Sequence, residues 1–509
     1  MELKLKTARH NFYEPITFAP FSCETMREYI VPDSCADIAR IVETSAQVWT
    51  TGREIGVDGR LCASGNIDVS VLYIPEKGDG PCALRFKIPF QCCADGCWEQ
   101  NGEFPDIRGE LQNIETRLLN PRKVLTRANI EFYPTGCRRI SLSIFTEAEE
   151  DASIQLLCDR RNAGVIAAVR EKEFTFEEEL PISPGRGGVE EIISSRFDIR
   201  ATDCKLIGSK LVVKGIVAAT ILYREAGGRM ELAKNEFPFS QILDGTELEE
   251  DWNTECVFRL LSTECVIGGD SGSTDRHVLT MTLQLRCRVT VSRTEEISFI
   301  ADLYSTEAPV LVDTSEITLR EDVQRYTRRQ NLRYVLETGT AVKTVLDTEV
   351  GCGGIRQGES RESFEIPIWI RVLYLDENDA LHSIRREFSA ICPKDQDDSH
   401  HMGGWAVCRG DLMTNILPDG VELRFPVDCC LETWLQNCYL CISGGKREDE
   451  EREIVKSPSV ILRKIGNDEK LWTVAKQYRT TCQAILEANE ISDERQLPDD
   501  RMLLIPKHR

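Results

Sequence analysis

The feature that most constrains the fold is a repeat of about 150 residues. A Leu-Tyr pair occurs at Leu72-Tyr73 and returns at Leu222-Tyr223 and Leu373-Tyr374, at intervals of 150 and 151 residues. Each pair ends a run in which apolar and polar residues alternate, which is typical of a β-strand with one buried face. The apolar face holds Ile67, Val69, Val71 and Tyr73 in the first copy, Val217, Ala219, Ile221 and Tyr223 in the second, and Ile368, Ile370, Val372 and Tyr374 in the third. We therefore expect three similar β-rich units, in which these tyrosines are packing residues.

The segments around each Leu-Tyr pair predict further strands and turns. A tight hairpin is expected before the repeated strand, at Asp58-Gly59 and at Gly208-Ser209. Glycine-rich or polar turns follow it at residues 77–80, 226–228 and 377–379. Short helical turns are expected over Asp37–Val42 and Val189–Ile193. Each unit is otherwise predicted to be mostly antiparallel β-structure, of sandwich or barrel type.

With 509 residues, the chain is too long for a single core. The repeat period gives predicted units over residues 1–165, 166–310 and 311–443, of which the third is the most divergent. Residues 444–458 (GGKREDEEREIVKSP) have the composition of a charged linker. Residues 459–509 differ from the repeats and are predicted to form a separate domain.

The predicted last domain has the element order βααβ. Val460 to Ile465 and Met502 to Ile505 are expected to be strands, and Leu471 to Tyr478 has the apolar spacing of an amphipathic helix. A second helix is expected to start at Thr480 or Thr481, either of which is a good N-cap. It would bury Ile485 and Leu486.

This segment resembles a LysM module, which is a small domain that usually binds N-acetylglucosamine chains. The resemblance rests on LWTVAKQY (471–478), ILEANEI (485–491) and LLIP (503–506). Asp468-Glu469-Lys470 and Asp500-Arg501 replace the family's usual residues in the two loops beside the sugar groove. These changes favour a protein ligand. Trp472 is expected either in the module's core or in contact with a ligand. Trp472, Lys476, Arg479, Asn489 and Ile491 are the candidate partner-binding residues.

Composition narrows the range of functions. The formal net charge of −22 disfavours nucleic acid as a partner, whereas residues 459–509 carry a net charge of +1. The first residues do not resemble a signal peptide and no long apolar run is present, so we expect a cytosolic protein without membrane insertion.

The 21 cysteines are then expected to be reduced. A zinc site at Cys429, Cys430, Cys438 and Cys441 is the alternative, which the short spacing disfavours.

No catalytic motif stands out in the sequence. There is no phosphate-binding loop, no Gly-x-Ser-x-Gly and no His-Glu-x-x-His, and the chain has only six histidines. We therefore predict a non-enzymatic protein without a cofactor.

The combination of motifs resembles the SPOCS-domain family of spore coat morphogenetic proteins. The matching features are YIVPD (29–33), the strand GNIDVSVLY (65–73) and the C-terminal LysM-like segment. The resemblance implies a scaffold in the mother-cell cytoplasm at the forespore surface. It also implies docking, through the LysM module, on a SpoIVA-like coat ATPase, together with other coat proteins. The alternative is a peptidoglycan-binding or N-acetylglucosamine-binding LysM protein of the cell wall or the spore cortex.

Overall fold

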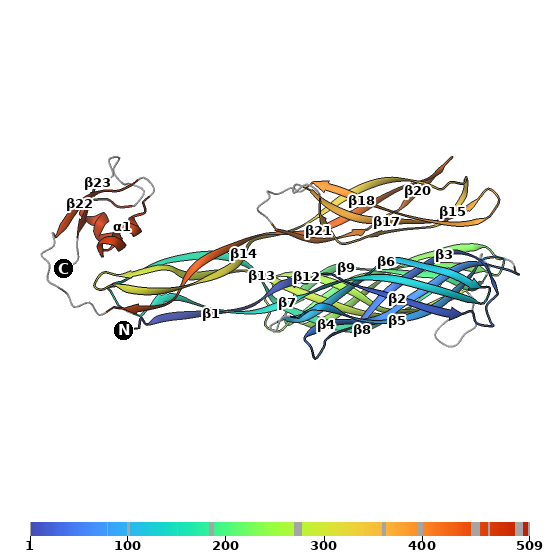
Figure 1. Cartoon of the computed structure of the whole chain (residues 1–509), viewed down its shortest axis with the longest axis horizontal. Helices are drawn as coiled ribbons and strands as arrows, with labels where there is room; N and C mark the ends of the chain where they lie inside the picture. Colours follow the sequence, from blue (N-terminus) through green and yellow to red (C-terminus); the bar gives the residue numbers. More distant parts are fainter. Residues whose placement is uncertain are drawn as a thin grey trace.

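A computed structural model describes residues 2–78, 80–98, 102–149, 151–182, 188–268, 277–358, 363–393, 401–448, 459–466, 469–493 and 502–506. Within these ranges the chain forms three tandem β-units and a small C-terminal α+β domain, here called the head (Figure 1). The predicted mainly-β fold class is therefore confirmed.

Unit 1 combines two antiparallel sheets. The inner sheet has the order β3-β4-β5, and it contains the repeated strand β4. The outer sheet is built on the long strand β7, which pairs with β1, β2 and β6, and it continues into unit 2 where β1 pairs with β8 (Ile154–Pro181). The strands are β1 (Leu5–Thr17), β2 (Phe21–Ile30), β3 (Ile38–Ile55), β4 (Arg60–Pro75), β5 (Cys82–Cys97), β6 (Gly102–Asn120) and β7 (Lys123–Ala148).

Units 2 and 3 repeat this arrangement. One long strand, β8 or β14, replaces β1 and β2 and pairs with the last strand of its own unit, β13 or β21. Unit 2 contains β8 (Ile154–Pro181), β9 (Val189–Ile207), β10 (Lys210–Glu225), β11 (Met230–Asp244), β12 (Asn253–Ile267) and β13 (Val278–Ser305). Unit 3 contains β14 (Val310–Glu337), β15 (Val342–Cys352), β16 (Arg356–Gln357), β17 (Ser363–Asp376), β18 (Leu381–Pro393), β19 (His401–Cys408), β20 (Met413–Leu417) and β21 (Gly420–Arg447).

The strand bounds can be placed beside the predicted boundaries between units. The boundary predicted between residues 165 and 166 lies inside β8. This single long strand begins at Ile154, and the alternating pattern continues through it. The boundary at residue 310 coincides with the start of β14, at Val310. The first residues of the predicted linker, 444–447, belong to β21, and residues 449–458 lie outside the described residues.

The two predicted helical turns are wrong, because both segments are strands that contain β-bulges. In β3 the register against β4 shifts between Ile38 and Arg40 and again between Ile41 and Glu43. Two shifts at equivalent places interrupt β9 opposite β10 and β15 opposite β17. Each bulge inserts one residue and breaks the alternation. The apolar residues then fall three or four apart, a spacing that resembles a helix.

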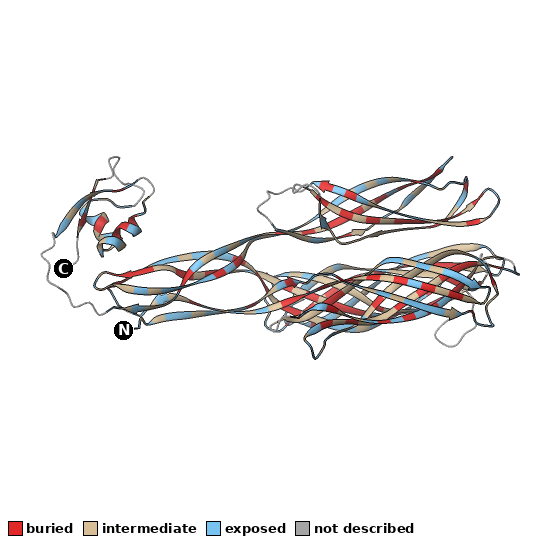
Figure 2. Ribbon diagram, viewed as in Figure 1, coloured by how far each residue is buried: buried red, intermediate tan, exposed pale blue. Residues whose placement is uncertain are grey.

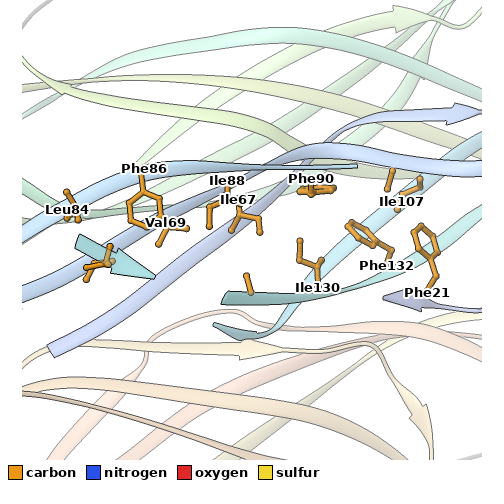
Figure 3. Packing of buried hydrophobic residues seen from close by; sticks show 14 of the residues in the cluster. Phe21, Ile67, Val69, Leu84, Phe86, Ile88, Phe90, Ile107, Ile130 and Phe132 are labelled. Atoms are coloured by element: carbon orange, nitrogen blue, oxygen red, sulfur yellow. The ribbon is translucent and has the colours of Figure 1, made fainter. Parts of the chain in front are cut away.

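The predicted packing role of the repeated tyrosines is confirmed. Tyr73, Tyr223 and Tyr374 are all at most 2% exposed, and each lies in the core of its own unit. In unit 1 this core lies between the two sheets, with Phe86 and Phe90 from β5 facing Ile130 and Phe132 from β7 (Figures 2 and 3).

The repeated leucines have a different role, since they join the three units. Leu72, Leu222 and Leu373 belong to one buried cluster, and each points away from the core that holds the neighbouring tyrosine. The residues inserted by the bulges, Val42, Ile193 and Leu346, join the same cluster. The Leu-Tyr pair thus recurs because the tyrosine packs in the core of its own unit and the leucine packs in the contact between units.

Charged groups reinforce this junction. The Arg196 guanidinium of unit 2 donates to both carboxylate oxygens of Asp347 in unit 3, at 2.5 and 2.7 Å. Arg371 of unit 3 is paired with Asp347 and also reaches Glu43 of unit 1, at 3.2 Å. Burial alone would raise the pKa of Asp347, but the hydrogen bonds and charges of Arg196 and Arg371 lower it below its ordinary value.

The long strand pairs extend beyond the sandwiches and form a narrower part, here called the stalk, that leads toward both chain termini (Figure 1). It consists of the outer parts of β1 with β7, β8 with β13, and β14 with β21. Side chains from all three pairs share one buried cluster, which includes Phe12, Ile144, Val165, Phe299 and Leu319.

The expectation that all cysteines are reduced is wrong at one pair, since Cys62 and Cys93 form a disulfide. These residues lie directly opposite each other on β4 and β5, so the sheet register itself brings the two sulfur atoms together. The other cysteines of the described residues are free thiols. Among the described residues, no group of three or more His, Cys, Asp or Glu side chains could hold a metal ion.

Candidate functional site

The head has the predicted βααβ order. Its elements are β22 (Val460–Lys464), α1 (Leu471–Tyr478), α2 (Cys482–Ala488) and β23 (Met502–Pro506), and β22 pairs antiparallel with β23. The predicted N-cap is confirmed, because the Thr481 hydroxyl accepts a hydrogen bond from the Ala484 N–H at 3.0 Å. The buried head core contains Ile465, Leu471, Val474, Ala475, Ile485, Leu503 and Ile505.

Two of the five candidate partner-binding residues, Trp472 and Lys476, lie one turn apart on α1 and contact the chain's own unit 2. The Trp472 indole Nε1–H donates to Asp302 Oδ2 at 2.8 Å, and Lys476 Nζ donates to Asp302 Oδ1 at 2.6 Å. Asp302 lies near the end of β13, in the stalk. Trp472 is thus half-buried against the head core, as one of the two expectations for this residue had it, and its indole N–H is bonded within the same chain.

Tyr304, two residues beyond Asp302, completes this contact. Its ring is packed edge-on against Trp472, with the ring centroids 4.9 Å apart, and its side chain belongs to the head core. Its hydroxyl donates to the Thr480 carbonyl oxygen at 2.7 Å. Burial is the main cause that raises the pKa of the Tyr304 hydroxyl. Nothing in the sequence singled out Asp302 or Tyr304, because their role depends on an approach between distant segments.

The other three candidates have different surroundings. Asn489 ties α2 to β23: its amide donates to the Ile485 and Leu504 carbonyl oxygens, and its Oδ1 accepts from the Leu504 N–H. Ile491 packs against the head core. Arg479 is exposed at the end of α1, where its φ of 50° ends the helix. The partner-binding role of all five residues stays a prediction. Of the altered loop residues, Asp468, Asp500 and Arg501 lie outside the described residues.

A second candidate site is a cavity of about 1570 Å³ where the three units meet. Its walls come from all three units and include Trp49, Ser194 and Trp369. Most of its charged side chains are already paired with each other, as at Arg385, which donates to Glu387 at 3.0 Å and lies over the Trp369 ring. Because these charges are satisfied within the protein, the cavity does not define a ligand.

The fold and the head together define a class: tandem β-sandwich proteins that carry a LysM-type module. The comparisons with known proteins specify this class further. The family model for the SPOCS domain of SipL matches residues 188–267, which span β9 to β12 of unit 2, and the LysM domain model matches residues 464–506. The resemblance to the SPOCS-domain family and to the LysM module, seen in the sequence, is thereby confirmed at these two segments.

The two matches make this a sporulation-related protein with a LysM module, and they indicate an association with the spore coat. Both domains are non-catalytic binding domains. Searches of curated proteins and of solved structures found no match. Among the described residues, no helix has the length and apolar character needed to cross a membrane.

Proposed function

We propose that this protein is a non-enzymatic scaffold of the spore coat, which works in the mother-cell cytoplasm at the forespore surface. The LysM head docks on a SpoIVA-like coat ATPase, and the three-unit body presents a surface on which other coat proteins gather. The alternative function is binding of peptidoglycan or N-acetylglucosamine chains, which the LysM match favours.

The observation that carries the choice of a protein partner is the contact between the head and β13. Trp472 and Lys476 already bind a protein segment, through the Asp302 carboxylate. A strand of a partner protein can present a carboxylate beside an aromatic ring in the same way. Charge supports the same choice, because the nearly neutral head is repelled less than the acidic remainder of the chain by an acidic partner.

The test compares two ligands on the full-length chain. Purified SpoIVA-like ATPase and chitin oligomers are each titrated against the wild type, and binding is measured by calorimetry. We expect binding to the ATPase and none to the sugar. The variant Arg479→Glu should weaken ATPase binding, whereas Lys464→Glu, on the exposed side of β22, should not. Tight sugar binding without ATPase binding would contradict the proposal and support the cell-wall alternative.

A further inference from the structure

The three units share a structural feature at the end of the stalk, where each last strand contains a β-bulge. The register shifts place the inserted residue at Thr146 in β7, Ala301 in β13 and Ser443 in β21. Side chains from the three ends meet in one buried cluster that includes Phe145, Ile300 and Ile442, each of which directly precedes its bulge residue. A bulge redirects the side chains that follow it. The three bulges are therefore equivalent positions at which the units can be compared.

Only unit 2 places a carboxylate and a tyrosine at these positions. The residue after the bulge is Glu147 in unit 1, Asp302 in unit 2 and Gly444 in unit 3. Two residues further, the chain has Glu149, Tyr304 and Lys446, respectively. Glu147 is paired instead with Lys6 on the neighbouring strand. The head thus lies on the one strand end whose side chains match Trp472 and Lys476.

The contact satisfies the Asp302 carboxylate and the Tyr304 hydroxyl, although the buried Thr480 hydroxyl beside it has no hydrogen-bond partner among the described residues. Both oxygens of the Asp302 carboxylate accept hydrogen bonds from the head, and Oδ1 also accepts from the Leu303 N–H. Tyr304 is only 5% exposed, and the hydrogen bond of its hydroxyl is buried. Charge-assisted bonds around a partly buried carboxylate are stronger than neutral ones. A buried aromatic anchor beside a satisfied charge is the usual composition of a specific interface.

We propose that Asp302 and Tyr304 form a latch that holds the LysM head against the stalk of its own chain. In the closed state the face of α1 that carries Trp472 and Lys476 is occupied and cannot bind another ligand. A segment that opens the latch must compete for this face of α1. It would be an extended strand that, like residues 302–304, presents a carboxylate two residues before an aromatic ring. Because the internal segment is tethered, its effective concentration is high, so the closed state lowers the apparent affinity for any such competitor. This inference does not depend on the identity of the coat partner.

The first test detects the closed contact. A carbodiimide activates carboxylates, and a lysine amine within reach then attacks the carbonyl carbon, so that an amide forms and the urea leaves. Because Lys476 Nζ and Asp302 Oδ1 are 2.6 Å apart, treatment of the full chain is expected to link them, as read by mass spectrometry. A mixture of ¹⁵N-labelled and unlabelled chains distinguishes a link within one chain from a link between two. Absence of the link, or a link that mixes the two labels, would overturn the proposal.

The second test opens the latch. Asp302→Lys places a cation against Lys476, and the control Glu296→Lys makes the same charge change at an exposed position of the same strand. Amide hydrogen exchange in residues 471–480 is expected to rise about tenfold or more in Asp302→Lys and to stay unchanged in Glu296→Lys. If Asp302→Lys also loses protection in β23, then the milder Asp302→Asn decides, with the same expected rise confined to α1. Equal exchange in variant and control would overturn the latch.

The same variants test the competitor chemistry. The probe is a synthetic peptide of residues 297–306 (ISFIADLYST), and its control has alanine in place of the aspartate and the tyrosine. The probe is expected to bind the Asp302→Lys chain at least about tenfold more tightly than it binds the wild type, while the control peptide binds neither. Equal affinity of the probe for both chains, or no binding to either, would overturn the proposal.

Discussion

Replacement of Asp347 by alanine tests whether charge pairing at the junction holds unit 2 against unit 3. The Asp347 side chain is 1% exposed and bonds to Arg196 and Arg371, which come from different units. The substitution removes the nearest carboxylate from both guanidinium groups, which lie at the edge of the cavity between the units. Removal of one member of a buried ion pair costs about 3–5 kcal/mol. Glu349, which lies 3.1 Å from Arg371 and 3.8 Å from Arg196, compensates in part and favours the lower end of that range.

Hydrogen exchange of the backbone amides of β9 and β15 measures this loss, because these strands carry the paired groups. A cost near 3 kcal/mol corresponds to about a hundredfold faster exchange, at about 1.4 kcal/mol per factor of ten. The matched control is Asp159→Ala, which removes the surface pair with Arg161 and should cost below about 1 kcal/mol. An Asp347→Ala effect no larger than that of Asp159→Ala would refute the reasoning.

Three further predictions concern the joined units. Acid should separate the units, because Arg196 and Arg371 keep the pKa of Asp347 below 3.8 despite its burial. The stabilisation from the ionised Asp347 carboxylate is therefore complete above pH 3.8 and is lost as the pH falls below that value. Small-angle scattering from about pH 5 to about pH 2 can follow the separation. Leu222→Ala at the junction should cost about 2–5 kcal/mol in urea unfolding, whereas the exposed Leu119→Ala should change little; equal midpoints would contradict the leucine's role. Differential alkylation should find Cys62 and Cys93 oxidised, and two free thiols at these positions would contradict the disulfide. Replacement of both cysteines by serine should lower the unfolding free energy of unit 1 by about 3–4 kcal/mol.

The sequence was sufficient to predict elements that depend on local patterns. Alternation around Tyr73 predicted a half-buried strand, and the apolar spacing from Leu471 to Tyr478 predicted α1. Both patterns follow from the geometry of a single strand or helix. The Thr481 N-cap was predictable for the same reason, because the side chain bonds only three residues ahead.

Contacts between distant segments were not predictable. Leu72 faces away from the Tyr73 core, and only the approach of the other units shows why it is buried. The bulges of β3 made a strand look helical, because each inserted residue breaks the alternation and only the pairing with β4 shows that the segment is extended. Asp302 and Tyr304 lie in a stretch typical of an ordinary strand, and their role appears only when the head lies beside them.

The central claim, that the head directs this protein to the forespore surface, is tested most directly by its localisation. A fluorescent fusion of the full chain is compared with a fusion that ends at Glu448, which keeps all strands of the three units and removes the head. In sporulating cells we expect the full chain to surround the forespore and the shortened chain to spread through the mother cell. A shortened chain that still surrounds the forespore would contradict the claim and assign targeting to the three-unit body.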